Sequence, residues 1–272
     1  MIRSAITVSL VREARGGPFV FWEDLAGSCR KIAALGFDGV EIFPPSAEAI
    51  AEATVRPLLE QNKLKLAAVG TGGGWVTQQL TLTSHDQSVR NRAKEFVRAI
   101  IDAAAKFGAP AIVGSLQGRW SAQVDCDTAI HYLRDALEDL GEHARKYSVP
   151  LLYEPLNRYE TNVINTQGEA AILLRSLKTT NVKLLCDLYH MNIEETDLAG
   201  AIRAAGEKVG HIHFADSNRR PIGNGHTDVS AIARALTDIG YDGYVSAECL
   251  PWPDSETAAQ MTIRSFRRFF RG

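Results

Sequence analysis

The chain has 272 residues, of which 45% are hydrophobic, and its 30 Lys and Arg against 32 Asp and Glu give a formal net charge of −2. This balance leaves no basic excess to neutralise phosphate groups, so it disfavours a nucleic-acid partner. No apolar run approaches the roughly 20 residues that a membrane span needs, and the amino-terminal apolar stretch breaks at Arg12 and Glu13, unlike a secretory signal. We therefore expect a soluble, cytoplasmic protein without a membrane partner.

Eight short β-rich runs alternate with amphipathic stretches along the chain, the arrangement typical of parallel βα units. At eight units the repeat is about 34 residues, enough for one strand, one helix and two connections. The clearest helical pattern covers residues 87–107, where apolar residues recur every three or four positions. The predicted strands are residues 5–11, 39–43, 65–70, 111–114, 150–154, 182–187, 210–215 and 244–248.

Glycines punctuate several junctions between a predicted helix and the next strand, as in "LGFDGVEIF", "FGAPAIVG" and "IGYDGYVSAE". A glycine there ends the helix by adopting a left-handed conformation. An open doubly wound sheet is the alternative architecture, but residues 16–18 match neither of the glycine-rich phosphate loops typical of such sheets. We therefore expect an α/β fold, a closed (β/α)8 barrel forming a single domain over residues 1–272.

The four cysteines are scattered without CxxC spacing, which fits neither a disulfide framework nor a sulfur-ligated zinc site. We expect reduced thiols. Cys186 and Cys249 flank polar strand ends on alternating positions, so their side chains should point outward into the core between strands and helices.

Ionisable residues stand at the ends of four successive predicted strands, about one βα unit apart. The carboxyl ends of barrel strands meet at one mouth, where three carboxylates and an imidazole would need a cation to offset their repulsion and burial. Such oxygen-rich ligands suit Mn²⁺, Mg²⁺ or Co²⁺. For any one of them a helix cap or loop hydrogen bond is the simpler interpretation, but four in succession favour a metal site. These residues are Glu154, Asp187, His213 and Glu248.

Further polar residues follow those strand ends, among them Glu160, His190 and Arg219, while His211 precedes His213 on the same strand face and is expected to pack inside the barrel. The segments "EPLNRYETNVINT", "DLYHMNIEETD", "HIHFADSNRRPIGNGHTD" and "IGYDGYVSAE" resemble the D-tagatose 3-epimerase family, one of the xylose isomerase-like TIM barrels. The resemblance is closest over residues 149–250, whereas residues 80–119 look like the shorter group that includes 5-keto-L-gluconate epimerase.

The resemblance implies that Glu154, Asp187, His213 and Glu248 bind one divalent ion, with Mn²⁺ first and Co²⁺ or Mg²⁺ as alternatives. It implies that Glu160, His190 and Arg219 hold the end of the substrate nearest the carbonyl. It also implies a homo-oligomer, a dimer or tetramer.

Inverting a carbon beside a ketone requires a base on one face and an acid on the other, and Glu154 and Glu248 fit those roles. We expect inversion of C3 of a ketose or keto-sugar acid through a metal-bound cis-enediolate. An aldose–ketose isomerase and a keto-cyclitol or 3-keto-glycoside lyase remain alternatives on the same site. An abasic-site endonuclease is a remote alternative, because its metal cluster needs extra histidines and the third and fourth strand ends, "AVGTGGGW" and "GSLQGRW", contain none. A non-catalytic sugar-binding module is a further alternative, but it would not explain the acid/base pair.

Arg119 follows the fourth predicted strand in "GSLQGRW". A guanidinium at the barrel mouth would suit a carboxylate or phosphate at the distal end of the substrate, and an exposed or structural arginine is the alternative.

Overall fold

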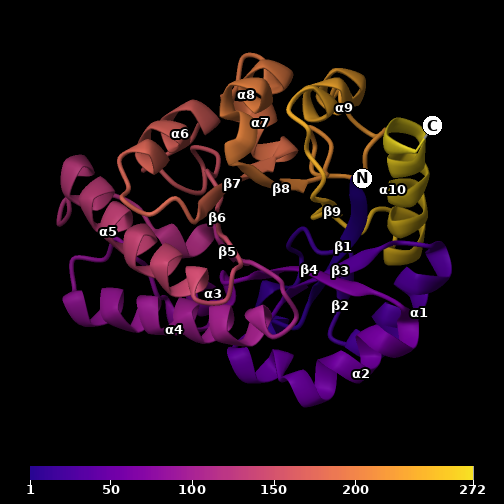
Figure 1. Ribbon diagram of the computed structural model, residues 1–272, viewed down its shortest axis with the longest axis horizontal. Helices are drawn as coiled ribbons and strands as arrows, with labels where there is room; N and C mark the ends of the chain where they lie inside the picture. Colours follow the sequence, from indigo (N-terminus) through magenta and orange to yellow (C-terminus); the bar gives the residue numbers. More distant parts are fainter. Residues whose placement is uncertain (272) are drawn as a thin grey trace.

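The computed structural model describes residues 1–271 and has a closed barrel of parallel strands at its centre (Figure 1). Each barrel strand pairs with the next one along the chain, and the last pairs back with the first through Arg3–Tyr244 to Ile6–Ala247. The predicted TIM barrel is confirmed, and the open sheet is excluded because β1 and β9 close the ring. The strands are β1 (Arg3–Ser9), β3 (Gly39–Phe43), β4 (Lys65–Gly70), β5 (Ala111–Val113), β6 (Leu151–Tyr153), β7 (Val182–Asp187), β8 (Val209–His213) and β9 (Tyr244–Ala247).

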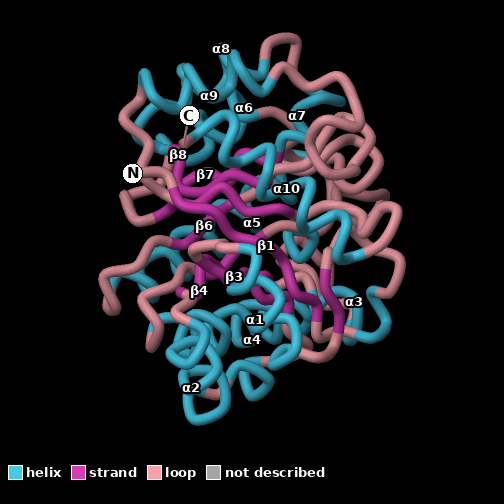
Figure 2. The backbone as a smooth tube through the Cα atoms, turned by 90° about the vertical axis from the view of Figure 1, so that its right-hand side faces the viewer, coloured by secondary structure: helices cyan, strands magenta, loops and turns pink. Residues whose placement is uncertain are grey.

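Helices surround the barrel, and in Figure 2 the magenta strands run between the cyan helices. None of the helices within residues 1–271 combines the length and hydropathy of a membrane span. The helices are α1 (Leu25–Leu35), α2 (Glu52–Asn62), α3 (Gly73–Gln78), α4 (Gln87–Ala105), α5 (Cys126–Arg145), α6 (Gln167–Arg175), α7 (Leu188–Glu194), α8 (Leu198–Ala205), α9 (Val229–Asp238) and α10 (Ser255–Phe270).

The predicted helix over 87–107 is α4, which buries Ala93, Val97, Ile100, Ile101 and Ala104 at helical spacing. It ends two residues earlier than predicted because the chain turns through Gly108, whose φ is +68°. Gly36 follows α1 and Gly240 follows α9, and their φ angles of +82° and +67° place both in the same left-handed region, as predicted for these helix ends.

Three strands, β3, β4 and β7, have the predicted bounds, and the other five differ from the prediction by one or two residues at an end. Pairing in β6 stops at Tyr153 and in β9 at Ala247, so Glu154 and Glu248 are the first residues beyond their strands. A two-residue strand that the sequence pattern did not predict, β2 (Phe21–Trp22), pairs with the end of β1.

The main core lies between the outer faces of the strands and the helices, and Cys186 and Cys249 are buried in it as predicted. A second, small apolar cluster consists of Ala68, Ile112, Leu152 and Leu185. Because successive strand residues alternate between faces, Glu154 and Asp187 share the face of Leu152 and Leu185, two positions closer to the carboxyl end. The alternation therefore stacks the polar residues on an apolar layer inside the barrel.

Candidate active site

Glu154, Asp187, His213 and Glu248 come together at the mouth of the barrel, with one ligating atom of each lying within 4.8 Å of the others. The distances from His213 Nδ1 are 3.3 Å to Glu154 Oε1, 3.2 Å to Asp187 Oδ2 and 3.5 Å to Glu248 Oε2. These four residues stand at the ends of successive strands in the sequence, and the fold brings them to one point.

The two carboxylate oxygens of Asp187 have different partners. Oδ1 accepts hydrogen bonds from the backbone N–H groups of Tyr189 (2.8 Å) and His190 (3.3 Å), which caps the amino end of α7. Oδ2 faces His213. The helix cap and the cluster are therefore compatible roles of one side chain, and the cap holds the second oxygen in place.

Gly114, just after β5, makes room for Glu154. A Cβ atom at Gly114 would lie 2.4 Å from Glu154 Oε2, so a larger residue would push the carboxylate aside. The other oxygen, Oε1, is buried and has no hydrogen-bond partner. A buried carboxylate oxygen without a donor is costly, and a divalent ion that accepts oxygen ligands would satisfy it.

The pKa values in the cluster reflect burial opposed by neighbouring charge. Burial raises the pKa of Glu154, and it raises that of Glu248 to about 8. Burial would also raise the pKa of Asp187, but the Arg219 guanidinium and the imidazoles of His190 and His213 together outweigh burial and lower that pKa. For His213, burial would lower the pKa, but the surrounding carboxylates raise it well above 6.5. The site thus favours positive charge at its centre, and its donor set of three carboxylates and one imidazole fits a divalent ion.

Arg219 lies on the loop between β8 and α9 in a left-handed conformation with φ +62°. Its Nη1 lies 3.1 Å from Asp187 Oδ2, its Nη2 donates to Glu248 Oε2, and its guanidinium stacks 4.6 Å from the ring centre of Tyr189.

The loop that carries Arg219 is organised by the buried carboxylate of Asp216, a residue that was not predicted from the sequence. Asp216 accepts hydrogen bonds from the backbone N–H groups of Ser217, Gly223, Asn224, Gly225 and Thr227.

His190 and Glu160 lie beside the cluster, His190 buried and Glu160 partly exposed. Burial lowers the pKa of His190 to about 3, so the imidazole is neutral at physiological pH. Asn157 links the pair, with its backbone N–H 3.2 Å from His190 Nδ1 and its Nδ2 donating to Glu160 Oε1 at 3.0 Å.

Arg119 lies apart from this group. It is exposed, and its Nη1 donates to the carbonyl oxygen of Tyr159 at 3.2 Å. Gly118, at φ +88°, turns the chain before it, and Arg119 does not line the cavity above the cluster.

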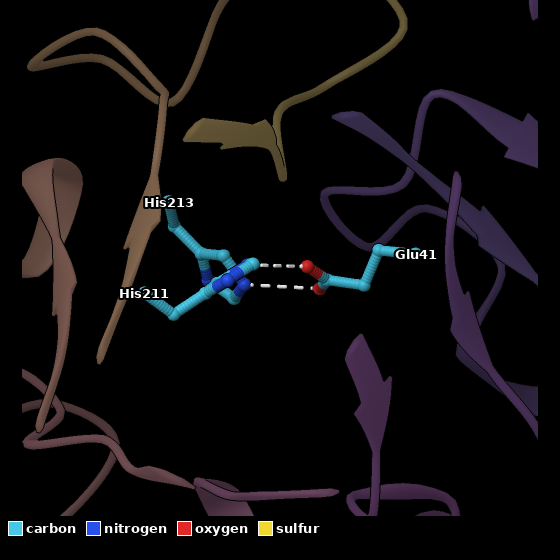
Figure 3. A group of neighbouring side chains, drawn as sticks. All are labelled: Glu41, His211 and His213. Atoms are coloured by element: carbon cyan, nitrogen blue, oxygen red, sulfur yellow. Dashed lines mark hydrogen bonds and ion pairs between the residues drawn. The ribbon is translucent and has the colours of Figure 1, made fainter. Parts of the chain in front are cut away.

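Glu41 in β3 is a further site residue that was not predicted from the sequence. Its carboxylate spans the barrel interior to β8, where Oε2 lies 2.8 Å from His211 Nε2 and Oε1 lies 3.0 Å from His213 Nε2 (Figure 3). Burial would raise the pKa of Glu41, but the two imidazoles lower it, so the carboxylate is ionised. The available signal was an acidic residue between Val40 and Ile42 in a predicted buried strand. His211 is buried inside the barrel as expected, with Glu41 as its partner.

A cavity of about 320 Å³ opens above the cluster. Its floor is polar and includes Glu154, Glu160, His190, His213, Arg219 and Glu248. Its outer wall is apolar and is made by Pro18, Phe19, Phe43, Trp75, Val76 and Leu156.

Residues 29–269 match the family model described as xylose isomerase-like TIM barrel. D-psicose 3-epimerase of Agrobacterium fabrum is 32% identical over 242 residues, which cover 86% of this chain and 79% of that protein. 3-Dehydro-D-guloside 4-epimerase of Escherichia coli is 30% identical over 236 residues, covering 84% and 88%. The structure of D-psicose 3-epimerase with D-tagatose from Clostridium cellulolyticum H10 superposes with a TM-score of 0.80 at 26% identity, covering 98% of this chain and 99% of that one.

The family model covers nearly the whole barrel, and the named relatives are sugar epimerases, in agreement with the resemblance of residues 149–250. The chain therefore belongs to the xylose isomerase-like TIM barrel family.

Proposed function

We propose that this chain is a divalent-metal-dependent sugar epimerase that inverts C3, the carbon beside the keto group, of a neutral ketose. The observation that carries the proposal is the pair Glu154 and Glu248, a buried and a half-buried carboxylate that share one imidazole and line one cavity. Ketose 3-epimerases among the relatives support the same reaction.

Glu154, Asp187, His213 and Glu248 would hold the ion, with Mn²⁺ as the first candidate and Co²⁺ or Mg²⁺ as alternatives. When bound, the ion would polarise the keto group of the substrate and so increase the acidity of the neighbouring C–H.

The chain itself supplies the proton transfers. Glu154 follows β6 and Glu248 follows β9, and two strands, β7 and β8, stand between them. A sugar carbon placed between the two carboxylates can lose its proton to one and receive a proton from the other on its opposite face. Glu160, His190 and Arg219 line the same floor and would bind the oxygens near the keto group.

The cavity lining favours a neutral sugar over a keto-sugar acid or a phosphate. Among the described residues that line the cavity, Arg219 is the single arginine, and there is no lysine. The carboxylates of Asp187 and Glu248 already neutralise the charge of Arg219. The outer wall is aromatic and aliphatic, which suits the C–H faces of a sugar and offers no partner to an anion. Arg119, exposed and bonded to a backbone carbonyl, adds no charge to this wall.

A 3-keto-glycoside is the second candidate substrate, because the relative from Escherichia coli is named a 3-dehydro-D-guloside 4-epimerase and matches over 84% of this chain. The proton chemistry is the same, on a carbon beside a ketone.

The endonuclease alternative finds no support, since the residues after β4 and β5 that line the cavity are Thr71, Gly72, Gly114 and Ser115 rather than histidines. A homo-oligomeric state and a cytoplasmic location stay predictions.

The isotope test follows from the two-carboxylate arrangement. In D₂O the enzyme should incorporate deuterium at C3 of fructose, psicose or tagatose, with much less turnover of 5-ketogluconate. Glu154→Gln and Glu248→Gln should each lower epimerisation by about 10²–10⁴-fold, because an amide cannot exchange the proton, while one epimer still exchanges in each variant. NMR of the recovered sugars measures both. Deuterium at C1 would identify an isomerase, exchange confined to a 3-keto-glycoside would identify the second substrate, and unaltered turnover in both variants would refute the acid/base pair.

Metal removal should abolish turnover and lower the melting temperature, because an ion that binds only the folded chain stabilises it, by about 2.7 kcal/mol at a hundredfold excess over Kd. Added Mn²⁺ or Co²⁺ should restore both. Calorimetry and activity assays after exhaustive chelation provide the measurement. Full activity in protein shown by elemental analysis to be metal-free would contradict the proposal.

Gly114→Ala should displace the Glu154 carboxylate, since the new Cβ would fall 2.4 Å from Oε2. Misplacing one catalytic group by about 1 Å costs on the order of a hundredfold in rate, so we expect a loss of that size together with weaker Mn²⁺ binding. Gly168→Ala in α6 is the matched control, because the nearest atom to its new Cβ is 3.9 Å away. Equal kcat/KM and metal affinity in the two variants would show that Gly114 does not make room for Glu154.

A further inference from the structure

Glu41 and His211 lie in the barrel interior on the side of His213 that faces away from the carboxylate cluster. Glu41, His211 and His213 are 4%, 1% and 1% exposed, so each needs a partner inside the protein. Figure 3 shows the Glu41 carboxylate reaching from β3 to both imidazoles, one oxygen to each.

The backbone departs from regular pairing at both ends of this contact. The register between β3 and β4 shifts between Val40 and Glu41. The register between β7 and β8 shifts so that Gly210 is the extra residue, immediately before His211. A Cβ at Gly210 would lie 2.6 Å from Lys183 Cβ, so the irregularity requires glycine. Such bulges re-aim neighbouring side chains, and here they flank the Glu41–His211 pair.

The hydrogen-bond chemistry then fixes the two rings. An ionised carboxylate only accepts hydrogen bonds, so the Nε2 atoms of His211 and His213 both carry a hydrogen. Because Nε2 keeps its hydrogen, Nδ1 is the nitrogen of His213 that can give up its proton to offer a lone pair to an ion, and it lies 3.2–3.5 Å from three carboxylate oxygens. A metal-binding histidine requires this arrangement, with one nitrogen free for the ion and the other donating to a fixed acceptor.

We propose that Glu41, anchored by His211, is a positioning residue that holds His213 with Nδ1 toward the carboxylate cluster and thereby sets the affinity of the metal site. The inference rests on the proposed function, because it presumes that the cluster binds an ion. The competing possibility is that Glu41, His211 and His213 bind an ion of their own, since their ligating atoms also lie within 4.8 Å of one another. The observed contacts favour the first, because both Nε2 atoms already donate to Glu41.

The test compares four chains freed of metal, each titrated calorimetrically with Co²⁺ alone. Glu41→Leu removes the acceptor at similar volume, and Kd should rise about tenfold to a hundredfold, the usual effect of losing such a partner. Glu41→Gln retains one carbonyl oxygen that can accept from His213 if the amide turns its NH₂ toward His211, so its Kd should lie between those of Glu41→Leu and the unaltered chain.

Thr7→Val is the matched control. Thr7 is buried, faces Glu41 in register on the neighbouring strand β1, and donates to the Ala247 carbonyl at 2.9 Å, so its loss perturbs the same layer without touching His213. Its Kd should change by less than about twofold. In the Co²⁺ form, the shifted exchangeable Nε2–H resonance of His213 should persist in Thr7→Val and disappear or broaden in Glu41→Leu.

The outcomes separate the hypotheses. Wild-type affinity in Glu41→Leu, or an equal loss in Thr7→Val, would overturn the positioning role. Two ions per chain, with one lost in Glu41→Leu, would assign the group to a second metal site instead. If the unaltered chain binds no Co²⁺, the proposed metal site itself fails. If Glu41→Leu does not fold, His211→Leu serves in its place, because it removes only the side chain that anchors Glu41. The Kd of His211→Leu for Co²⁺ should rise about threefold or more. An unchanged Kd in His211→Leu, together with wild-type affinity in Glu41→Gln, would equally overturn the proposal.

Discussion

Three carboxylates converge on a single imidazole nitrogen at the mouth of the barrel, His213 Nδ1, and they are nearly shut off from water. Burying three carboxylates so close together is costly, and the surrounding side chains offset the cost of each carboxylate. Arg219 supplies a guanidinium, and its loop is tied together by the five backbone hydrogen bonds of Asp216. A site that concentrates negative charge in this way is suited to a divalent cation and, through it, to removing a proton beside a ketone.

His213 has different surroundings on its two sides, and this asymmetry links the interior of the barrel to its mouth. Nδ1 faces the carboxylate cluster, whereas Nε2 faces Glu41, which His211 holds from below. The two register shifts beside Glu41 and His211 show that strand pairing is adjusted where these side chains meet. The apolar layer of Ala68, Ile112, Leu152 and Leu185 completes the interior.

The fold and the four converging residues could be predicted from the sequence because both follow from local regularities. Alternation along each strand fixes which side chains point inward, and the βα repeat brings the carboxyl ends of successive strands together. Glu154, Asp187, His213 and Glu248 each stand at such an end, so their proximity required no knowledge of long-range packing.

Other parts of the site depend on contacts between distant segments. Glu41 is 170 residues from His211 in the chain, and its isolated occurrence in a strand gave no partner. The conformation of the loop that carries Arg219 depends on Asp216, whose role emerges only when the loop closes around it. Arg119 follows a strand as the ligands do, but Gly118 turns the chain and leaves the guanidinium exposed beside Tyr159. A position after a strand thus indicates nearness to the mouth and not the direction of a side chain.

Anomalous diffraction from crystals of this chain grown with Mn²⁺ tests the central claim most directly. The account predicts one manganese peak per chain, coordinated by Glu154, Asp187, His213 through Nδ1, and Glu248, with the contact between Glu41 and His213 Nε2 retained. A peak bound instead by Glu41, His211 and His213 Nε2, or no peak at the mouth of the barrel, would contradict it.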